Sequence, residues 1–131
     1  DLGLAYYAYS SISGGAGPGG WSVLARGNPA NVGLAIARIQ DELRRLISEP
    51  VSAADLADNQ AYFTGRLPLQ LESSEGVAGS ILNMELYALG LDYLLNYRDI
   101  IMRLTAEDLL AAAQRYLDPG RLAIGVAGPA N

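Results

Sequence analysis

Residues 2–13 show no helical period and are read here with the two-residue period of a β-strand. Residues 2–13 combine tyrosine with small apolar residues, and residues 21–27 form a second run of strand-forming residues. Between the two runs, residues 14–20 hold five glycines and a proline, which predicts a loop. The pattern predicts an antiparallel hairpin with a loose turn, in which Tyr6 and Tyr7 point to opposite faces.

A helical period begins after residue 28. Asn28 can cap the free backbone N–H groups of a helix, and Pro29 is well tolerated at the first helical position. Apolar residues then recur at three- and four-residue spacing as far as residue 46, with charged residues between them. This pattern predicts an amphipathic helix that ends before Pro50.

Two later segments begin with the spacing of a capping box. Ser52 and Asp55 predict the start of a second helix, which Pro68 should kink or end. Thr105 and Asp108 repeat the spacing and predict a last helix through residue 117. In both pairs the hydroxyl accepts from a backbone N–H, and aspartate closes the box more weakly than glutamate.

A third helix is predicted over residues 75–89, with a break at Gly90 and a short continuation over residues 91–97. Gly76 and Gly79 each weaken the start of this helix by up to about 1 kcal/mol relative to alanine. We therefore expect the two glycines to lie closely against a neighbouring element.

The C-terminal residues predict a turn followed by a strand. Asp118, Pro119 and Gly120 have the composition of a turn, and residues 121–127 have strand character. The predicted order is β-β-α-α-α-α-β: an α+β fold, a two-layer sandwich with a mostly antiparallel sheet and helices on one face. Residues 1–131 are predicted to form a single domain.

The predicted sheet is thin for the helices that it must support. An unpaired strand rich in tyrosine at a sheet edge is prone to aggregate. The chain also lacks a starting methionine, which indicates that it begins inside a longer polypeptide. We therefore expect a truncated domain that lacks its first strands, with further strands supplied by sequence outside this chain.

Composition excludes most familiar catalysis by this chain alone. It contains no histidine, cysteine or lysine. It therefore lacks the usual nitrogen and sulfur ligands of zinc, the bases of nucleophilic triads, a Schiff-base amine and the lysine of a phosphate-binding loop. The net charge of −5 argues against nucleic acid as a partner, and no apolar run is long enough to span a bilayer.

Six short motifs occur along the whole chain. In order they are G-L-A-Y-Y-A-Y-S-S (3–11), G-N-P-A-N-V (27–32), E-P-V-S (49–52), L-x-L-E-S-x-E-G (69–76), L-T-A-E-D (104–108) and R-Y-L-D-P-x-R-L (115–122). Together they resemble the C-terminal half of the insulinase/pitrilysin family of zinc metallopeptidases, which includes the mitochondrial processing peptidase and its bacterial relatives. Each motif is weak alone, and their order and spacing carry the resemblance.

The resemblance implies an incomplete enzyme. In that family two α+β halves enclose a chamber; the first half carries zinc on an H-x-x-E-H motif, and the second contributes a wall and groups that hold the peptide. The chain would then contain no catalytic residue and no metal ligand, with zinc in the missing N-terminal half of the parent protein. Its expected partners are the catalytic half of the same or a paired protein, in a homo- or heterodimer, and a peptide or protein substrate.

The resemblance also implies one substrate-binding residue. The family places an arginine and a tyrosine against the substrate backbone, and Tyr6 is the best match to the tyrosine, with Tyr7 as the alternative. The position of the arginine falls before Asp1, outside this chain. The competing interpretation is that Tyr6 packs its ring on a helix and hydrogen-bonds at the rim.

Two other functions stay open. Some family members have lost the zinc motif and serve as structural or substrate-recognition subunits, as in the processing-peptidase α subunit and the respiratory-complex core proteins. A free-standing binding module is the third interpretation. In addition, Asn59, Tyr62 and Arg66 fall on adjoining turns of the second predicted helix, where they would form either a partner-facing polar patch or a plain amphipathic face.

Overall fold

The computed structural model describes residues 3–15, 17 and 19–128. The chain divides into two compact units, one of residues 1–45 together with 117–131 and the other of residues 46–116. The predicted α+β character is confirmed at this level, because a two-stranded antiparallel sheet precedes five α-helices in the described residues.

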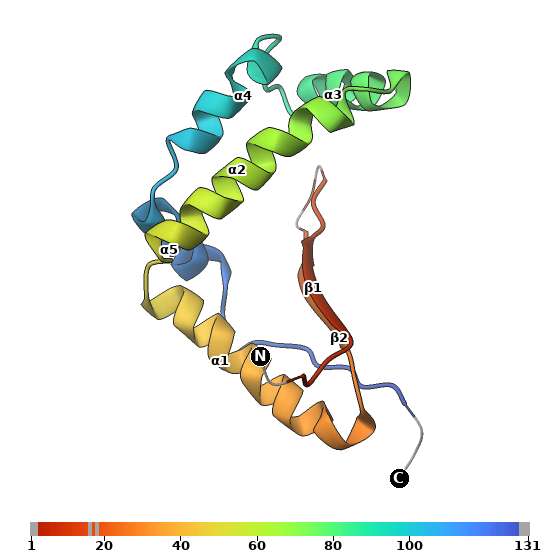
Figure 1. The fold of residues 1–131 in the computed structure, drawn as a ribbon, viewed down its shortest axis with the longest axis vertical. Helices are drawn as coiled ribbons and strands as arrows, with labels where there is room; N and C mark the ends of the chain where they lie inside the picture. The colour runs from red at the N-terminus through yellow and green to blue at the C-terminus, as the bar shows by residue number, and fades with distance from the viewer. Residues whose placement is uncertain (1–2, 16, 18, 129–131) are drawn as a thin grey trace. The chain divides into compact units, whose positions relative to one another are not determined.

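The first unit contains the predicted hairpin. Strands β1 (Tyr7–Ile12) and β2 (Trp21–Arg26) are antiparallel and pair in register from Tyr7 opposite Arg26 to Ile12 opposite Trp21 (Figure 1). The Ser11 and Ser22 hydroxyls lie 3.0 Å apart across the pair. The strands are shorter than the sequence pattern suggested, but their pairing and their order are as predicted.

The helical part of the chain begins where the capping residue predicts. The Asn28 side chain accepts a hydrogen bond from the Ala30 N–H (3.0 Å), and the short 3-10 helix η1 (Pro29–Asn31) leads into α1 (Val32–Ser48). On α1, Arg44 pairs with Asp41 at 3.0 Å and Arg45 with Glu42 at 2.8 Å. These i,i+3 pairs support the polar face of the helix.

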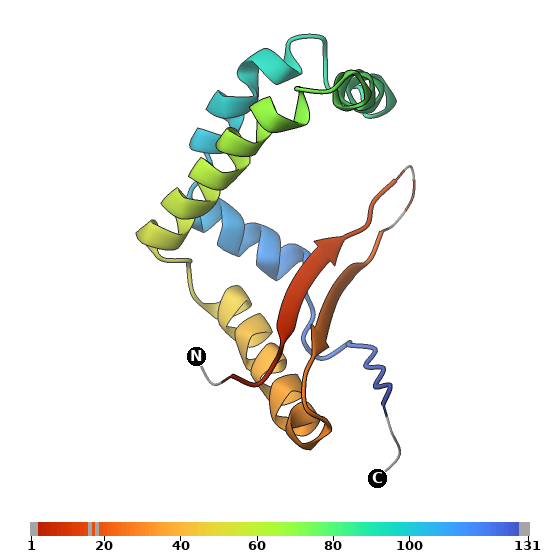
Figure 2. The same cartoon turned by 45° about the vertical axis from the view of Figure 1, so that its right-hand side comes forward.

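The second unit holds α2 (Ala53–Gln70), α3 (Ser74–Leu86), α4 (Tyr93–Met102) and α5 (Ala106–Tyr116). Helices α2 and α4 lie side by side in both views (Figures 1 and 2). Both predicted capping pairs are confirmed: the Asp55 N–H donates to the Ser52 hydroxyl and the Asp108 N–H donates to the Thr105 hydroxyl. Of the helices described, none is long and apolar enough to cross a bilayer.

Two helix boundaries differ from the predicted ones. Helix α2 continues past Pro68 to Gln70, so the proline does not end it. The third helix ends earlier, at Leu86. The backbone then adopts positive φ at Ala88 (50°) and Gly90 (89°) before α4 begins. Helix α4 is therefore a separate element rather than a continuation.

The two helical glycines have different surroundings. A Cβ added to Gly76 would overlap the carbonyl oxygen of Gln70, at the end of α2. The predicted close approach is confirmed for Gly76. A Cβ added to Gly79 would meet no atom within 4 Å, so the same prediction is wrong for Gly79.

The predicted C-terminal strand is wrong. The turn before it forms, because the Gly120 N–H donates to the Asp118 carboxylate (2.9 Å) and the Arg121 N–H donates to the Asp118 carbonyl (3.0 Å). Residues 121–127 then adopt no regular secondary structure. A strand needs a neighbour for its backbone groups, and among the described residues the hairpin strands pair only with each other.

Few apolar side chains are buried. The buried apolar residues are Leu43, Met84 and Ala113, whereas large apolar side chains are exposed on each of the strands and α-helices. The accessible surface is 10146 Å². Two separate compact bodies, each with half the mass of this chain, would together expose only about 8,000 Å². The described residues therefore leave much of their apolar surface uncovered.

Candidate functional site

The three N-terminal tyrosines lie at the start of the hairpin. Tyr6 immediately precedes β1, and its backbone N–H donates to the carbonyl oxygen of Arg26 (2.7 Å). Its side chain is 77% exposed, against 45% for Tyr7. The rings of Tyr7 and Tyr9 stack with centroids 6.1 Å apart, so these two residues share a face as the two-residue period predicts. The backbone of Tyr6 is thus held, while its phenol stays accessible.

The strand edge beside Tyr6 offers backbone hydrogen bonds. Every residue of β1 and β2 is exposed, and in the described part of the chain each strand has only the other as a neighbour. The outward N–H and C=O groups of such a strand can pair with an extended peptide. Trp21, the single tryptophan of the chain, lies opposite Ile12 and can report on events at the hairpin.

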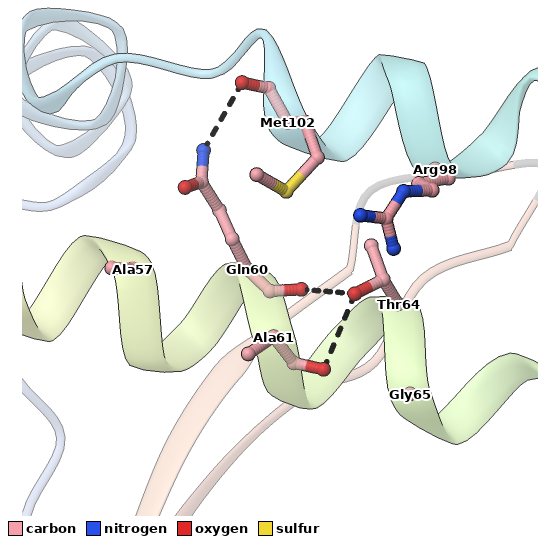
Figure 3. Close-up of a pocket in the computed structure, with 7 residues that line it drawn as sticks. All are labelled: Ala57, Gln60, Ala61, Thr64, Gly65, Arg98 and Met102. Atoms are coloured by element: carbon pink, nitrogen blue, oxygen red, sulfur yellow. Dashed lines mark hydrogen bonds between the residues drawn. The ribbon is translucent and has the colours of Figure 1, made fainter.

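A hollow between α2 and α4 has polar groups that serve helix packing (Figure 3). The Gln60 amide, from α2, donates to the carbonyl oxygens of Ile101 (3.1 Å) and Leu104 (3.0 Å) at the end of α4. The Thr64 hydroxyl donates to the Gln60 carbonyl (2.8 Å) within α2. The two Gln60 bonds join α2 to the last turn of α4 and to the segment that follows it. We assign the hollow a structural role.

The predicted polar patch on α2 forms only in part. Arg66 Nη1 donates to the Tyr62 hydroxyl (3.0 Å), and the guanidinium carbon lies 5.9 Å from the centre of the Tyr62 ring. The Asn59 amide instead donates to the backbone carbonyl of Asp55 (2.8 Å), within its own helix. The structure therefore brings Tyr62 and Arg66 together and leaves Asn59 out.

A second pocket, of about 490 Å³, was not predicted from the sequence. Helices α2, α3 and α4 and the segment between α3 and α4 line it; we call it the Arg66 pocket after the one charged residue in its lining. Tyr93 and Tyr97 contribute from α4, with ring centroids 5.9 Å apart. Their four-residue spacing indicates that they share one face of a helix. Only the tertiary structure places them in the same pocket as Arg66.

Burial raises the pKa of Tyr97 above its ordinary value, and the neighbouring Tyr93 raises it further, while Arg66 offsets part of the effect. The Tyr97 phenol is therefore neutral at physiological pH and keeps its proton for donation. The opposing effect of Arg66 comes from the Coulombic interaction of its positive charge with the Tyr97 phenol.

The residues of this chain do not fit a zinc site. The sequence has neither histidine nor cysteine, and the described residues include no group of three or more acidic side chains that could hold a metal. No protein-family model matches the chain, and no curated protein matches it.

Proposed function

We propose that this chain is the non-catalytic C-terminal half of a zinc-dependent metalloendopeptidase and that it holds the substrate peptide in the chamber. The observation that carries the proposal is the exposed phenol of Tyr6 beside a strand edge that has no partner among the described residues. The ordered motif series along the chain supports the same assignment. Zinc belongs in the other half of the parent protein, and this chain alone is inactive.

The hairpin would hold an extended peptide by two kinds of contact. The outer backbone groups of the hairpin would pair with the peptide backbone as an added strand. The Tyr6 phenol would donate to a peptide carbonyl oxygen near the bond to be cut, and one such oriented donor contributes up to about 1000-fold in rate. Tyr7 is the alternative donor, although its ring already stacks on Tyr9.

We also infer that the hairpin belongs to a larger sheet, in a two-layer sandwich with helices on one face. An isolated two-stranded hairpin is at best marginally stable in water. Here both strands are exposed along their full length. Strands from the remainder of the parent protein would pair with the edge of the hairpin that the peptide does not occupy.

The alternative is a zinc-less homologue that acts as a structural or substrate-recognition subunit. In that case Tyr6 would contact a partner protein rather than a peptide that is cut. An H-x-x-E-H motif in the polypeptide that pairs with this chain supports the enzyme, and its absence supports the subunit.

Peptide binding by the hairpin can be followed through Trp21 fluorescence. We expect an extended peptide of eight to ten residues to shift the Trp21 emission saturably, because strand addition changes its surroundings. The same peptide with alternate backbone nitrogens methylated should bind far less, since it cannot complete the ladder. Equal binding of both peptides, or no saturable shift, contradicts strand addition.

The role of Tyr6 is tested in the assembled enzyme. Tyr6→Phe should lower turnover by up to about 1000-fold with little change in stability, because the exposed hydroxyl makes no hydrogen bond within the described residues. Tyr116→Phe, on α5 and similarly exposed at 73%, is the matched control and should leave turnover unchanged. A loss of stability with unchanged turnover per folded molecule would show that Tyr6 only packs.

A further inference from the structure

We propose that the Arg66 pocket binds a carboxylate carried on an aromatic or apolar group. The pocket lies within the second unit, formed by α2, α3 and α4, whereas the hairpin lies in the first. The proposal is therefore independent of the peptide-holding role of the hairpin and of the metallopeptidase assignment.

The pocket has a buried floor and aromatic walls. Ser80 and Met84, from α3, are among the most buried residues of the chain, at 4% and 8% exposure. Phe63 from α2 and the edge-to-face pair of Tyr93 and Tyr97 from α4 line the sides. A volume of about 490 Å³ falls in the range of small-ligand sites. These surfaces can cover the apolar body of a ligand.

The floor is held in place by side-chain hydrogen bonds between helices. The Gln70 amide, at the end of α2, donates to the Ser80 hydroxyl (3.1 Å), which in turn donates to the Gly76 carbonyl (2.7 Å). Because Gly76 also lies against the Gln70 backbone, α2 and α3 approach closely at this point. These contacts hold α2 and α3 together on one side of the pocket, which limits the ordering cost of binding there.

Arg66 gives the pocket its charge preference. No acidic residue lines the pocket, and the ion pairs found among the described residues involve Arg38, Arg44 and Arg45 rather than Arg66. Arg66 Nη1 is engaged by the Tyr62 hydroxyl, which orients the guanidinium and leaves Nε and Nη2 available for a carboxylate. In a chain with net charge −5, this site selects an anion that the surrounding surface would repel.

Neutral donors complete the site. The side chains of Asn83, Tyr93 and Tyr97 line the pocket and donate no hydrogen bond to another described residue. Arginine with neutral donors and aromatic walls suits a planar carboxylate on an aromatic group. Two sources present that chemistry: a free aryl-substituted acid and the C-terminal carboxylate of a peptide that ends in an aromatic residue.

The test is a titration of the full 131-residue chain followed by amide and arginine side-chain NMR signals. The probes are N-acetylphenylalanine, its neutral carboxamide, and the tetrapeptide Ala-Ala-Ala-Phe with a free or an amidated C-terminus. We expect saturable shifts at Ser80, Asn83 and the Arg66 Nε–H with the acids, and affinity at least tenfold weaker with the amides. Tighter binding of the tetrapeptide acid identifies a peptide terminus as the ligand, and tighter binding of the free acid identifies a small molecule.

Arg66→Gln should weaken binding of the acids by about 10- to 100-fold, the usual worth of hydrogen bonds to a charged group. Arg98→Gln, which removes the same charge from α4 beside the other hollow, is the matched control and should leave the affinity unchanged. Arg66→Lys keeps the charge and should bind with an intermediate affinity. Circular dichroism verifies that each variant keeps its helices.

Three results would overturn the proposal. The acids and amides could bind alike, or Arg98→Gln could lose as much affinity as Arg66→Gln. The third is the absence of saturable shifts in the pocket residues. None of these results affects the peptide assay at Trp21, so failure here and failure of the peptide-holding function are separate outcomes.

Discussion

Individual side chains in this protein take their roles from what lies within a few ångströms of them. Tyr6 and Tyr97 have the same chemistry, yet one is an exposed donor beside a strand edge and the other is half-buried near an arginine. Gly76 and Gly79 stand three residues apart on one helix, yet only Gly76 contacts a neighbouring backbone. The sequence predicts the same close approach for Gly76 and Gly79, and the difference arises from the position of the end of α2 beside Gly76.

The glycine pair gives a prediction with opposite signs. Gly76→Ala should destabilise the chain by about 1–3 kcal/mol, because a methyl group cannot enter the contact with the Gln70 carbonyl. Gly79→Ala should stabilise it by about 0.5–1 kcal/mol, because the position is helical and open. The urea midpoints of the two variants, measured by circular dichroism, should shift in opposite directions; equal shifts would mean that α3 does not approach the end of α2.

Helix ends show how single elements are positioned. The start of α5 is closed by Thr105 and Asp108, whose side chains accept each other's backbone N–H groups at 2.9 and 3.1 Å. At the end of α4, carbonyl oxygens accept hydrogen bonds from a residue of another helix, the Gln60 amide of α2. The first arrangement was predicted because its partners are three residues apart. The second was not, because its partners are more than forty residues apart.

The capping pair at α5 predicts a dependence of stability on pH. The Thr105 backbone N–H, followed by the Thr105 hydroxyl, lowers the pKa of Asp108 below its ordinary value. The ionised Asp108 carboxylate therefore stabilises the folded chain above the unfolded-state pKa of about 3.9. This stabilisation is lost as the pH falls through the lower folded-state pKa.

The matched variant for this prediction is Asp108→Asn, which cannot titrate. We expect the wild-type chain to have the higher melting temperature at pH 7 and the difference to shrink towards pH 2.5. Melting curves recorded from pH 7 to 2.5 measure the difference. A constant difference would show that the Asp108 charge does not contribute.

Gln60 should contribute to the attachment of α4. Gln60→Ala should cost about 1 kcal/mol, because the carbonyls at the end of α4 lose a part-buried donor. Gln60→Glu should cost more at pH 7, since an ionised carboxylate cannot donate and faces the negative end of the helix dipole. That excess cost should fall at pH 3, where the carboxyl is protonated.

The control for Gln60 is Asp58→Ala, an exposed change on the same helix, which should alter the free energy of unfolding by less than about 0.5 kcal/mol. Chemical denaturation at both pH values distinguishes the three variants. If Gln60→Ala matched Asp58→Ala, the bonds to Ile101 and Leu104 would have no energetic role.

The chain as a whole buries too little apolar surface to behave as a tightly packed domain. Large apolar residues are exposed in both units, on elements as different as the hairpin and α3. This exposure supports the proposed place of the chain inside a larger assembly, where a second half would cover the surface. It also limits how cooperative the isolated chain can be.

We expect the isolated chain to bind the dye ANS and to unfold over a broad transition, with a van't Hoff enthalpy below the calorimetric enthalpy. Calorimetry and dye fluorescence on the same sample measure both. A sharp two-state transition without dye binding would favour the free-standing module over the half-enzyme.

Features that depend on neighbours within a few residues follow directly from the amino-acid sequence. These are the hairpin with its alternating tyrosines, the helix starts at Asn28, Ser52 and Thr105, and the turn at Asp118. The sequence also excluded zinc ligation by histidine or cysteine, because composition needs no structure.

Features that join distant residues follow from tertiary contacts. Residues 121–127 have strand character but no partner strand among the described residues, so they stay irregular. The Arg66 pocket exists because three helices bring Arg66, Ser80 and Tyr97 together. Local patterns specify dihedral angles, caps and the hairpin, whereas the pairing of distant strands and the formation of pockets depend on contacts whose partners lie far apart in the chain.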